Sequence, residues 1–470
     1  MTVRLRSIIL ALMAPVAGVP AQSGPVAAAA AARPAYIAYD TATIALTHAK
    51  LIDGTGAPAR ADQTVVITGG KIAAVGSTKE VRVPAGALVL DLTGKTVIPG
   101  IVGLHDHMYY GGRMQLATYP RLFLASGITT IRTTGSIDPY QELNLREAIQ
   151  SGKVPGPEVV ATGPYLEGKN GLRWARPLNT PEDARRVVRY WSEEGITWFK
   201  AYTQITNAEL AAAIDEAHKH GMKVTAHLCS VGYREAVADG IDNLEHGLFT
   251  DTEFWTGKQP DVCPTVGDSA MFYSLDIKSP DVQRTIHDMV SHHVAMTSTL
   301  AVFEISAASR IPLDERVYAA LAPDISVRVR AWYDSAQHVN DSAHRMTMKK
   351  AMEFERAFVA AGGLLGAGSD PCCLTEIAGY GDQRNFELLV EAGFTPEQTI
   401  QIMTLNGAKV LGFADRMGSI AVGKQADLVV LAGDPVAHPS DIRHVETVFR
   451  LGIGYDPKQL LVPVLGNVGR

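Results

Sequence analysis

Cysteine is scarce in this sequence, with 4 residues among 470. A disulfide-rich scaffold is therefore excluded, and we expect the fold to be stabilised by its hydrophobic core or by metal rather than by sulfur. An excess of positive charge is also lacking, because 43 Lys and Arg residues face 49 Asp and Glu residues, for a net charge of -6. Proteins that bind nucleic acid neutralise phosphates with basic surfaces, so we expect no nucleic-acid partner.

Long hydrophobic runs are lacking as well, and the one candidate lies near the N-terminus. Arg4 and Arg6 precede an apolar run over residues 8–19, which Pro15 interrupts and an Ala-rich stretch follows. This layout is typical of a secretory signal, and the run is shorter than the roughly 20 residues that span a bilayer. We expect a leader over residues 1–32, a periplasmic or secreted product, and no stable membrane insertion.

The few cysteines allow several states in an oxidising compartment. Cys372 and Cys373 are neighbours and could oxidise, pair with Cys229 or Cys263, or stay as thiols. Buried thiols are the first expectation, because free cysteine is among the most buried residue types.

Both flanks of the chain consist of short apolar stretches separated by glycine. Examples are QTVVITGGKIAAVG from Gln63 and GSIAVGKQADLVVLAGDP from Gly418. Alternation with a period of two and Gly punctuation predict short antiparallel strands. We expect residues 33–96 and 412–470 to form the two halves of one small β-sandwich domain.

The middle of the chain has a different rhythm, in which short apolar runs alternate with stretches of helical period. Eight such runs are present: VIPGIVGLHDH, ITTIRTTG, EVVATGP, TWFKAY, KVTAHL, NLEHG, VAMTSTL and LLGAGSD. Eight strand–helix units predict an α/β fold of the TIM type, a (β/α)8 barrel over residues 97–411, since about 250 residues are typical of that fold. Insertions are expected after the third and sixth strands and, the longest, over residues 301–355.

The ends of these runs are rich in side chains that bind metals. The residues concerned are His105, His107, Lys200, His227, His246 and Asp370. Because the C-terminal ends of barrel strands meet at one mouth, these residues are expected to share one site. Convergence carries this prediction, since each motif alone is weak.

The two His-x-His pairs show how weak a single motif is. With 14 His in the chain, chance alone gives about 0.4 such pairs. His218 and His220 lie in a helical pattern, where residues two apart point in different directions, and we expect them on the surface. His105 and His107 lie on a predicted strand, where they share a face and can bind one ion.

Asp370 and Lys200 have ordinary alternatives. Asp370 precedes Pro371 and could be a turn or N-cap residue. Lys200 could be an ion-pairing lysine, since an ammonium group cannot bind a metal; a buried neutral lysine, however, could react with carbon dioxide to give a carbamate that bridges two metals. Asp106 and Glu245, beside candidate ligands, are expected to be structural rather than catalytic.

The motifs GIVGLHDH, FKAY, TAH, LEHG and GSDP, with the closing GxxxxGxxADLVV element, resemble the amidohydrolase superfamily. The Lys on the fourth strand resembles the binuclear branch with a carboxylated lysine, and the chain looks most similar to its imidazolonepropionase-like and Xaa-Pro dipeptidase-like group. The resemblance implies that His105, His107 and Asp370 hold one divalent metal. His227 and His246 would hold the other, with carboxylated Lys200 between them.

By this resemblance the activity is hydrolysis of an amide or peptide bond by a metal-bridging hydroxide. Asp370 would be the catalytic base that passes the proton to the leaving nitrogen, and zinc is the expected ion. A dipeptide, an N-acyl amino acid or a related small amide is the expected substrate, and a homo-oligomer is expected. The alternatives are an esterase, lactonase or phosphotriesterase with the same site and a non-catalytic binding protein with the same fold.

Specificity is expected to come from loops at the strand ends. Aromatic residues and an arginine lie on or beside them: Tyr109, Tyr110, Arg173, Trp174 and Tyr202. An arginine beside aromatic rings suits a substrate carboxylate next to an apolar side chain. Each of these residues could equally be a solvent-facing loop residue. The aromatic residues of the longest insertion, such as Phe303, are expected to pack between helices.

Overall fold

A computed structural model describes residues 33–264 and 270–470. The predicted leader over residues 1–32 lies outside the described residues. Residues Ala35–Arg470 form one compact unit. Among the described helices, none is both long and apolar enough to cross a membrane.

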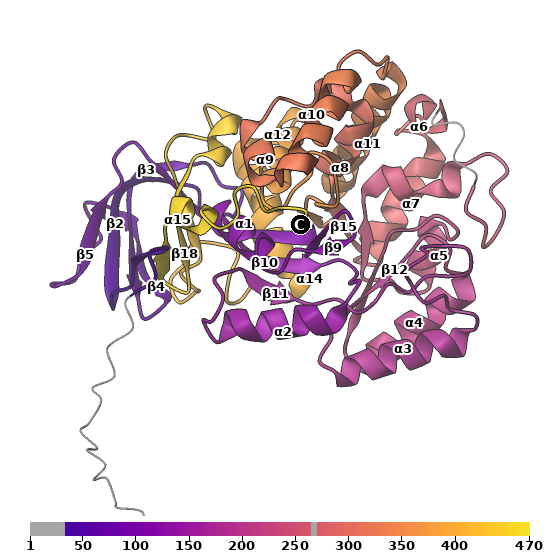
Figure 1. Ribbon diagram of the computed structural model, residues 1–470, viewed down its shortest axis with the longest axis horizontal. Coiled ribbons are helices and arrows are strands. Elements are labelled where there is room, and N and C mark those ends of the chain that lie inside the picture. The colour runs from indigo at the N-terminus through magenta and orange to yellow at the C-terminus, as the bar shows by residue number, and fades with distance from the viewer. Residues whose placement is uncertain (1–32, 265–269) are drawn as a thin grey trace, which may run out of the picture. The chain divides into compact units, whose positions relative to one another are not determined.

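Strands from both flanks of the chain share one nine-stranded sheet. They are β1 (Ile37–Tyr39), β2 (Thr43–Leu51), β3 (Arg60–Thr68), β4 (Lys71–Ser77), β5 (Leu88–Asp91), β6 (Thr96–Pro99), β17 (Leu428–Leu431), β18 (Val445–Arg450) and β19 (Ile453–Tyr455). The flanks meet where β6 pairs with β17, antiparallel, with Val97 opposite Val430. In Figure 1 the indigo and yellow strands accordingly lie together.

The side chains of this sheet explain why the two flanks stay paired. Leu46 and Val97 from the N-terminal flank and Leu428 and Phe449 from the C-terminal flank belong to one buried cluster. Burial of this apolar surface is the main force that holds antiparallel strands of distant sequence together. The domain boundaries and the β-sandwich form stay predictions.

All eight apolar runs of the middle region are strands. They are β7 (Ile101–Asp106), β10 (Ile128–Thr133), β11 (Glu158–Val160), β12 (Trp198–Ala201), β13 (Lys223–Ala226), β14 (Asn243–Glu245), β15 (Ala295–Ser298) and β16 (Leu365–Ala367). They form two parallel sheets, with orders β11-β10-β7 and β12-β13-β14-β15-β16. A parallel bridge between Thr162 and Trp198 joins the two sheets beside β11 and β12. The described residues contain no strand pairing between β16 and β7, so closure of the barrel stays a prediction.

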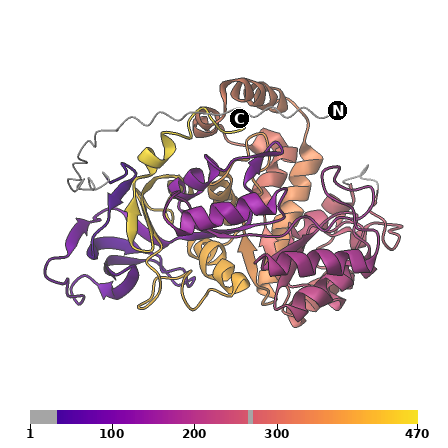
Figure 2. The ribbon, with the colours of Figure 1, turned by 60° about the horizontal axis from the view of Figure 1, so that its bottom comes forward.

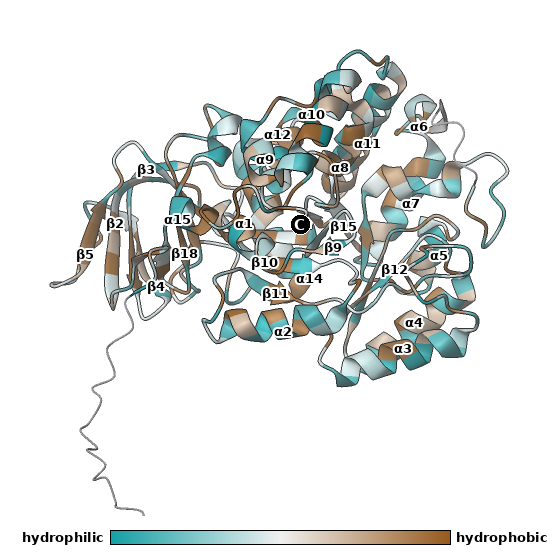
Figure 3. Cartoon of the chain, in the orientation of Figure 1, coloured by the Kyte–Doolittle hydropathy of each residue, from teal (hydrophilic) through white to brown (hydrophobic). Residues whose placement is uncertain are grey.

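Helices follow the strands as the pattern predicts. The main ones are α1 (Tyr119–Ala125), α2 (Pro139–Gln150), α3 (Pro181–Glu193), α4 (Asn207–Lys219), α5 (Tyr233–Ala238), α7 (Pro280–Ser291), α11 (Ser342–Ala360), α12 (Tyr380–Glu391), α13 (Pro396–Gln401) and α14 (Gly407–Leu411). Their starts are encoded locally: the side chain of Thr206 caps α4 in a capping box with Glu209. Helices α3 and α4 lie side by side (Figure 2). Both carry hydrophilic and hydrophobic residues, as surface helices do (Figure 3).

The remaining elements lie in the connections. They are β8 (Tyr109–Tyr110), β9 (Arg113–Met114), α6 (Ala270–Ser274), α8 (Leu300–Glu304), α9 (Glu315–Ala320), α10 (Pro323–Ala336) and α15 (Pro457–Leu461), together with the short turns η1 (Gly247–Thr250), η2 (Thr252–Phe254), η3 (Ile305–Arg310), η4 (Ile402–Asn406) and η5 (Pro439–Arg443). The longest predicted insertion, residues 301–355, contains α9 and α10. The hairpin of β8 and β9 follows β7 directly, which places it at the strand ends.

The structure contains a disulfide bond, whereas we expected the fold to be stabilised without sulfur. Cys229, just after β13, is bonded to Cys263 in the connection after β14, with their Cα atoms 4.8 Å apart. Sequence spacing could not reveal this pair, because only the parallel packing of β13 and β14 brings the two connections together. Cys372 and Cys373 are free thiols, half-buried rather than buried.

Candidate metal centre

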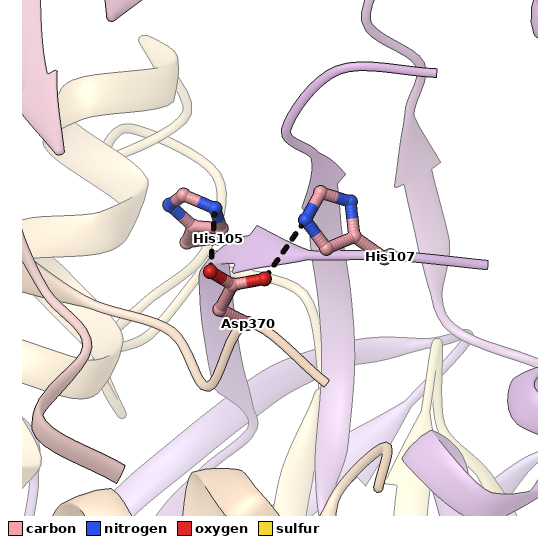
Figure 4. A group of neighbouring side chains, drawn as sticks. All are labelled: His105, His107 and Asp370. Atoms are coloured by element: carbon pink, nitrogen blue, oxygen red, sulfur yellow. Dashed lines mark ion pairs between the residues drawn. The ribbon is translucent and has the colours of Figure 1, made fainter. Parts of the chain in front are cut away.

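The first candidate ligands converge at the ends of β7 and β16. His105 and His107 are buried, and Asp370 lies in the loop after β16. Nε2 of His107 is 3.0 Å from Oδ1 of Asp370, and Nε2 of His105 is 3.6 Å from Oδ2 (Figure 4). One ligand atom from each of the three residues lies within 4.8 Å of the others. This trio is a possible His/Asp metal site.

The other three candidates lie against this trio. His246 follows β14, and its ring centroid is 4.4 Å from those of both His105 and His227. Nζ of Lys200, on β12, is 3.3 Å from Nε2 of His105. The structure therefore gathers all six predicted residues from five different strand ends, while His218 and His220 are exposed on α4 and its end, as predicted. The assignment of ligands to individual ions stays a prediction.

Hydrogen bonds behind the rings fix which nitrogen faces the site. Nδ1 of His105 is 2.8 Å from Oε2 of Glu245, and an ionised carboxylate only accepts, so this nitrogen donates. Nδ1 of His246 is 2.7 Å from Oγ1 of Thr299, while its Nε2 is buried without a hydrogen-bond partner in the described structure. In a metal-binding histidine one ring nitrogen is hydrogen-bonded to the protein and the other faces the metal. The buried Nε2 of His246, without a hydrogen-bond partner, fits this pattern.

Glu245 is the centre of this supporting network. Its Oε1 accepts from Nη2 of Arg132 at 2.5 Å and from Nδ2 of Asn243 at 2.9 Å, and also from the hydroxyl of Thr225. Burial raises the pKa of Glu245, but the charges of Arg132 and Lys200 outweigh burial and hold the pKa below its usual value. The structural role predicted for Glu245 is thus to accept a hydrogen bond from Nδ1 of His105, on the side of the ring that faces away from the site.

Two backbone features hold the strand ends close together. A Cβ atom at position 368 would lie 2.3 Å from the backbone N of His105, so only glycine allows this approach. Asp370 then donates its backbone N–H to the carbonyl of His105 at 2.8 Å. Asp370 and His246 both adopt left-handed backbone, with φ of 55 and 71°. Such conformations cost energy in residues other than glycine and persist where the surroundings impose them, often at functional sites.

Asp106 lies between His105 and His107 in the sequence, but its side chain contacts other residues. Its Oδ1 accepts from the hydroxyl of Ser369 at 3.0 Å, and the same hydroxyl lies 3.0 Å from Asp382. Burial, followed by the nearby Asp382 carboxyl, raises the pKa of Asp106 well above its usual value. A Cβ at position 103 would collide with Oδ2 of Asp106, which explains why glycine precedes Leu104 on β7. Asp106 is therefore a buried structural residue, as predicted.

The electrostatics of the site favour neutral imidazoles beside an ionised carboxylate. Burial, followed by the charge of Lys200, lowers the pKa of His227 to about 3 and that of His105 well below its usual value. Burial lowers the pKa of Lys200 to about 8. Burial raises the pKa of Asp370, but His105 and the hydrogen bond from His107 outweigh it, and the net shift is downward. Neutral imidazoles and an ionised carboxylate are the forms that bind metal ions.

The predicted substrate residues divide into three groups. Tyr109 stacks on His107 with ring centroids 4.5 Å apart, and Tyr202 lies 4.7 Å from His227, so both border the site. Tyr110 does not: its hydroxyl donates to the carbonyl of Leu374, and its side chain lines a separate pocket. Tyr110 is displaced because neighbouring residues on a strand point to opposite faces. Arg173 and Trp174 are exposed on the loop after β11.

Sequence reasoning missed two aromatic residues beside the site. The hydroxyl of Tyr165 is 2.7 Å from that of Tyr109, and its ring contacts Tyr202 at 5.1 Å. Its place just after β11 was a usable signal, since strand ends line the mouth. Phe303 packs against the core, in agreement with the expectation of packing, and its ring also lies 5.3 Å from that of His246. No sequence signal marks Phe303, because a helix in an insertion carries it.

Comparison with known proteins identifies the family to which the chain belongs. Residues 96–453 match the model of the Amidohydrolase family. The chain belongs to this family. It is therefore an enzyme of the class that hydrolyses C–N bonds in small molecules, and its family is metal-dependent.

Individual relatives are distant but similar in length. The chain is 23% identical to the imidazolonepropionase of Alkaliphilus metalliredigens, over 83% of this chain and 89% of that protein. It is 24% identical to the enamidase of Eubacterium barkeri, with 83% and 86% covered. A solved Xaa-Pro dipeptidase with bound methionine in the active site is similar with a TM-score of 0.66 at 21% identity, covering 88% of this chain and 100% of that one. At this identity the structural likeness shows the fold, which is of the TIM-barrel type.

The Glu245 network predicts a specific loss of stability. In Glu245→Gln the charge of Arg132 stays buried without its partner, which costs about 3–5 kcal/mol. We expect a lower midpoint of thermal unfolding by calorimetry. The double variant Arg132→Met/Glu245→Gln removes both charges and should recover part of that loss. A single variant as stable as the wild type would show that the ion pair does not hold the strands together.

Proposed function

We propose that this chain is an exported, metal-dependent amidohydrolase that cleaves the C–N bond of a dipeptide, an N-acyl amino acid or a related small amide. The observation that carries the proposal is the meeting of four imidazoles, Lys200 and Asp370, in which Nε2 of His246 is buried without a hydrogen-bond partner among the described residues. A buried nitrogen without a hydrogen-bond partner calls for an explanation, and a bound metal ion is one.

The donor set fits two divalent metal ions. His105, His107 and Asp370 supply nitrogen and oxygen ligands for one ion, for which zinc is the best match. His227 and His246 supply only two imidazoles for the second ion, so a further ligand is needed there. Lys200 is buried next to His105, and a carbamate on its Nζ would provide an anionic oxygen ligand for both ions. Bound in this way, the ions would lower the pKa of water and polarise the substrate carbonyl.

The chain's own residues would handle the protons. Asp370 has one oxygen 3.0 Å from Nε2 of His107 and the other 3.6 Å from Nε2 of His105, and lone pairs of its ionised carboxylate beyond these contacts would accept a proton from water. It can then deliver the proton to the leaving nitrogen. The backbone bond from Asp370 to His105 keeps the carboxylate aimed at the histidines throughout.

A cavity beside the site suggests the kind of substrate. It has a volume of about 440 Å³ and lies between the loops after β10 and β11 and helix α3. Tyr165, whose hydroxyl lies 2.7 Å from that of Tyr109, lines the cavity together with Trp174, Trp191, Arg176 and Arg186. Aromatic walls with guanidinium groups suit an apolar side chain next to a carboxylate, as in a dipeptide or an N-acyl amino acid.

Export and the closed fold complete the proposal. The arginines and apolar run of the leader support a periplasmic or secreted location, and the disulfide Cys229–Cys263 is typical of an oxidising compartment. The backbone bond between Asp370 and His105 and the packing of β16 against β7 support a closed (β/α)8 barrel. A homo-oligomer stays a prediction.

Metal analysis is the first test. After reconstitution we expect about two divalent ions per chain, as in two-metal hydrolases, measured by plasma emission spectroscopy. The double variant His227→Ala/His246→Ala should retain about one. His218→Ala/His220→Ala, an exposed pair of the same residue type, is the matched control and should retain both. Intact mass under native conditions should show the gain of one carbon dioxide, lost in Lys200→Ala. A wild type without metal would contradict the proposal.

Asp370→Asn tests the proton transfer. The amide cannot accept the proton, so kcat should fall by roughly 10²–10⁴. Turnover is measured on metal-reconstituted enzyme with dipeptides and N-acyl amino acids, and in parallel with lactones and aryl esters. Asp324→Asn, an exposed change of the same kind, serves as control. Unchanged turnover would remove Asp370 from the mechanism, and activity confined to esters would replace the amide proposal.

The loop after β11 predicts a change in KM. Trp174 lines the cavity and Arg173 precedes it on the same loop, so in Arg173→Ala and Trp174→Ala we expect a higher KM for dipeptides with a large apolar side chain and a smaller effect on kcat. The control is the same substrate with its carboxylate converted to an amide, for which Arg173→Ala should have no effect. If Arg173→Ala leaves the KM for the carboxylate substrate at the wild-type value, Arg173 does not bind the substrate.

A further inference from the structure

The turn after Asp370 contains two adjacent thiols whose sulfur atoms lie closer together than van der Waals contact. Sγ of Cys372 and Sγ of Cys373 are 2.7 Å apart, and both side chains are half-buried, so reagents can reach them. A disulfide bond measures about 2.05 Å, so the sulfur atoms need to approach by less than about 1 Å to bond. We propose that Cys372 and Cys373 are a reversible modification site, which closes to a disulfide between adjacent residues by exchange with a low-molecular-weight disulfide.

Backbone hydrogen bonds hold the main chain on either side of the pair. The carbonyl of Cys372 accepts from the N–H of Gly111 at 2.8 Å, in the hairpin of β8 and β9. The carbonyl of Cys373 accepts from the N–H of Glu376 at 2.9 Å, on the way to α12. Both contacts are made by backbone atoms, so forming the Sγ–Sγ bond uses none of the atoms that make them.

The exchange is balanced in atoms and electrons. The thiolate of one cysteine attacks the small disulfide, whose S–S bond breaks, and the first small thiol leaves with one proton. The second cysteine then attacks the mixed disulfide, forms the Cys372–Cys373 bond and releases the second small thiol with the other proton. Two electrons pass from the cysteine pair to the small disulfide, which is reduced to two thiols.

This pair should differ in stability from Cys229–Cys263. The Cα atoms of adjacent residues are roughly 3.8 Å apart, below the range of about 4.4–6.8 Å usual for disulfides. The Cα atoms of Cys229 and Cys263 are 4.8 Å apart, inside that range. A strained and accessible disulfide is the more easily reduced one. Mild reductant therefore opens the Cys372–Cys373 ring and leaves Cys229–Cys263 intact.

Peptide mapping of the full-length wild-type chain tests the proposal. The protein is equilibrated with oxidised or with reduced glutathione, denatured in acid and alkylated with N-ethylmaleimide. With oxidised glutathione, the peptide that contains both cysteines should carry no alkyl group and be lighter by two hydrogens. With reduced glutathione it should carry two alkyl groups, while Cys229 and Cys263 stay unalkylated. Two alkylated thiols in the oxidised sample, or glutathione attached to either cysteine as its end product, would overturn the proposal.

Backbone hydrogen exchange provides a second readout that does not depend on activity. Closing the ring should slow exchange of the amides of Gly111 and Glu376, which donate to the carbonyls of the pair. Cys372→Ser/Cys373→Ser is the control, and its exchange at these amides should be the same in both glutathione solutions. A redox-dependent difference that persists in this variant, or its absence in the wild type, would contradict the role assigned to the ring.

Discussion

The buried carboxylate of Glu245 is the constraint on which the site depends. It joins His105 on β7 to Arg132 on β10, and it lies on β14, in the second parallel sheet. Without a positive partner a buried carboxylate would be protonated or would destabilise the fold. Without the carboxylate, the guanidinium of Arg132 would destabilise the fold more strongly, because it cannot become neutral by losing a proton. The pair therefore ties the two sheets together and orients one ring of the candidate metal centre by the same contacts.

The other candidate ligands are held by neighbouring residues in a similar way. Each ring whose Nδ1 has a partner, Glu245 for His105 and Thr299 for His246, presents its Nε2 to the shared centre. Glycine at position 368 allows the loop of Asp370 to approach β7 closely, and the aspartate accepts a left-handed backbone there. Stability and function are thus combined in a few residues, as expected where a rigid supporting layer must hold ligands before a metal arrives.

The sequence predicts the features that follow from a regular spacing of apolar residues or from a position at the end of a strand. The eight strands follow from apolar runs, and the six converging residues follow from their positions at the ends of those strands. Tyr165 obeys the same rule and could have been added. Phe303 and the pair Cys229–Cys263 could not, because they depend on how an insertion folds back and on which connections lie side by side. Tyr110 was wrongly grouped with Tyr109, since adjacent strand residues face opposite ways.

The sheet built from both flanks has a consequence for how the protein is made. Its strand β6 finds its neighbour β17 only after the whole catalytic region has left the ribosome. Pairing of such distant segments is slow, because the entropy of closing a long loop precedes any gain from contact. Nascent chains would therefore stay incompletely folded until synthesis is nearly finished.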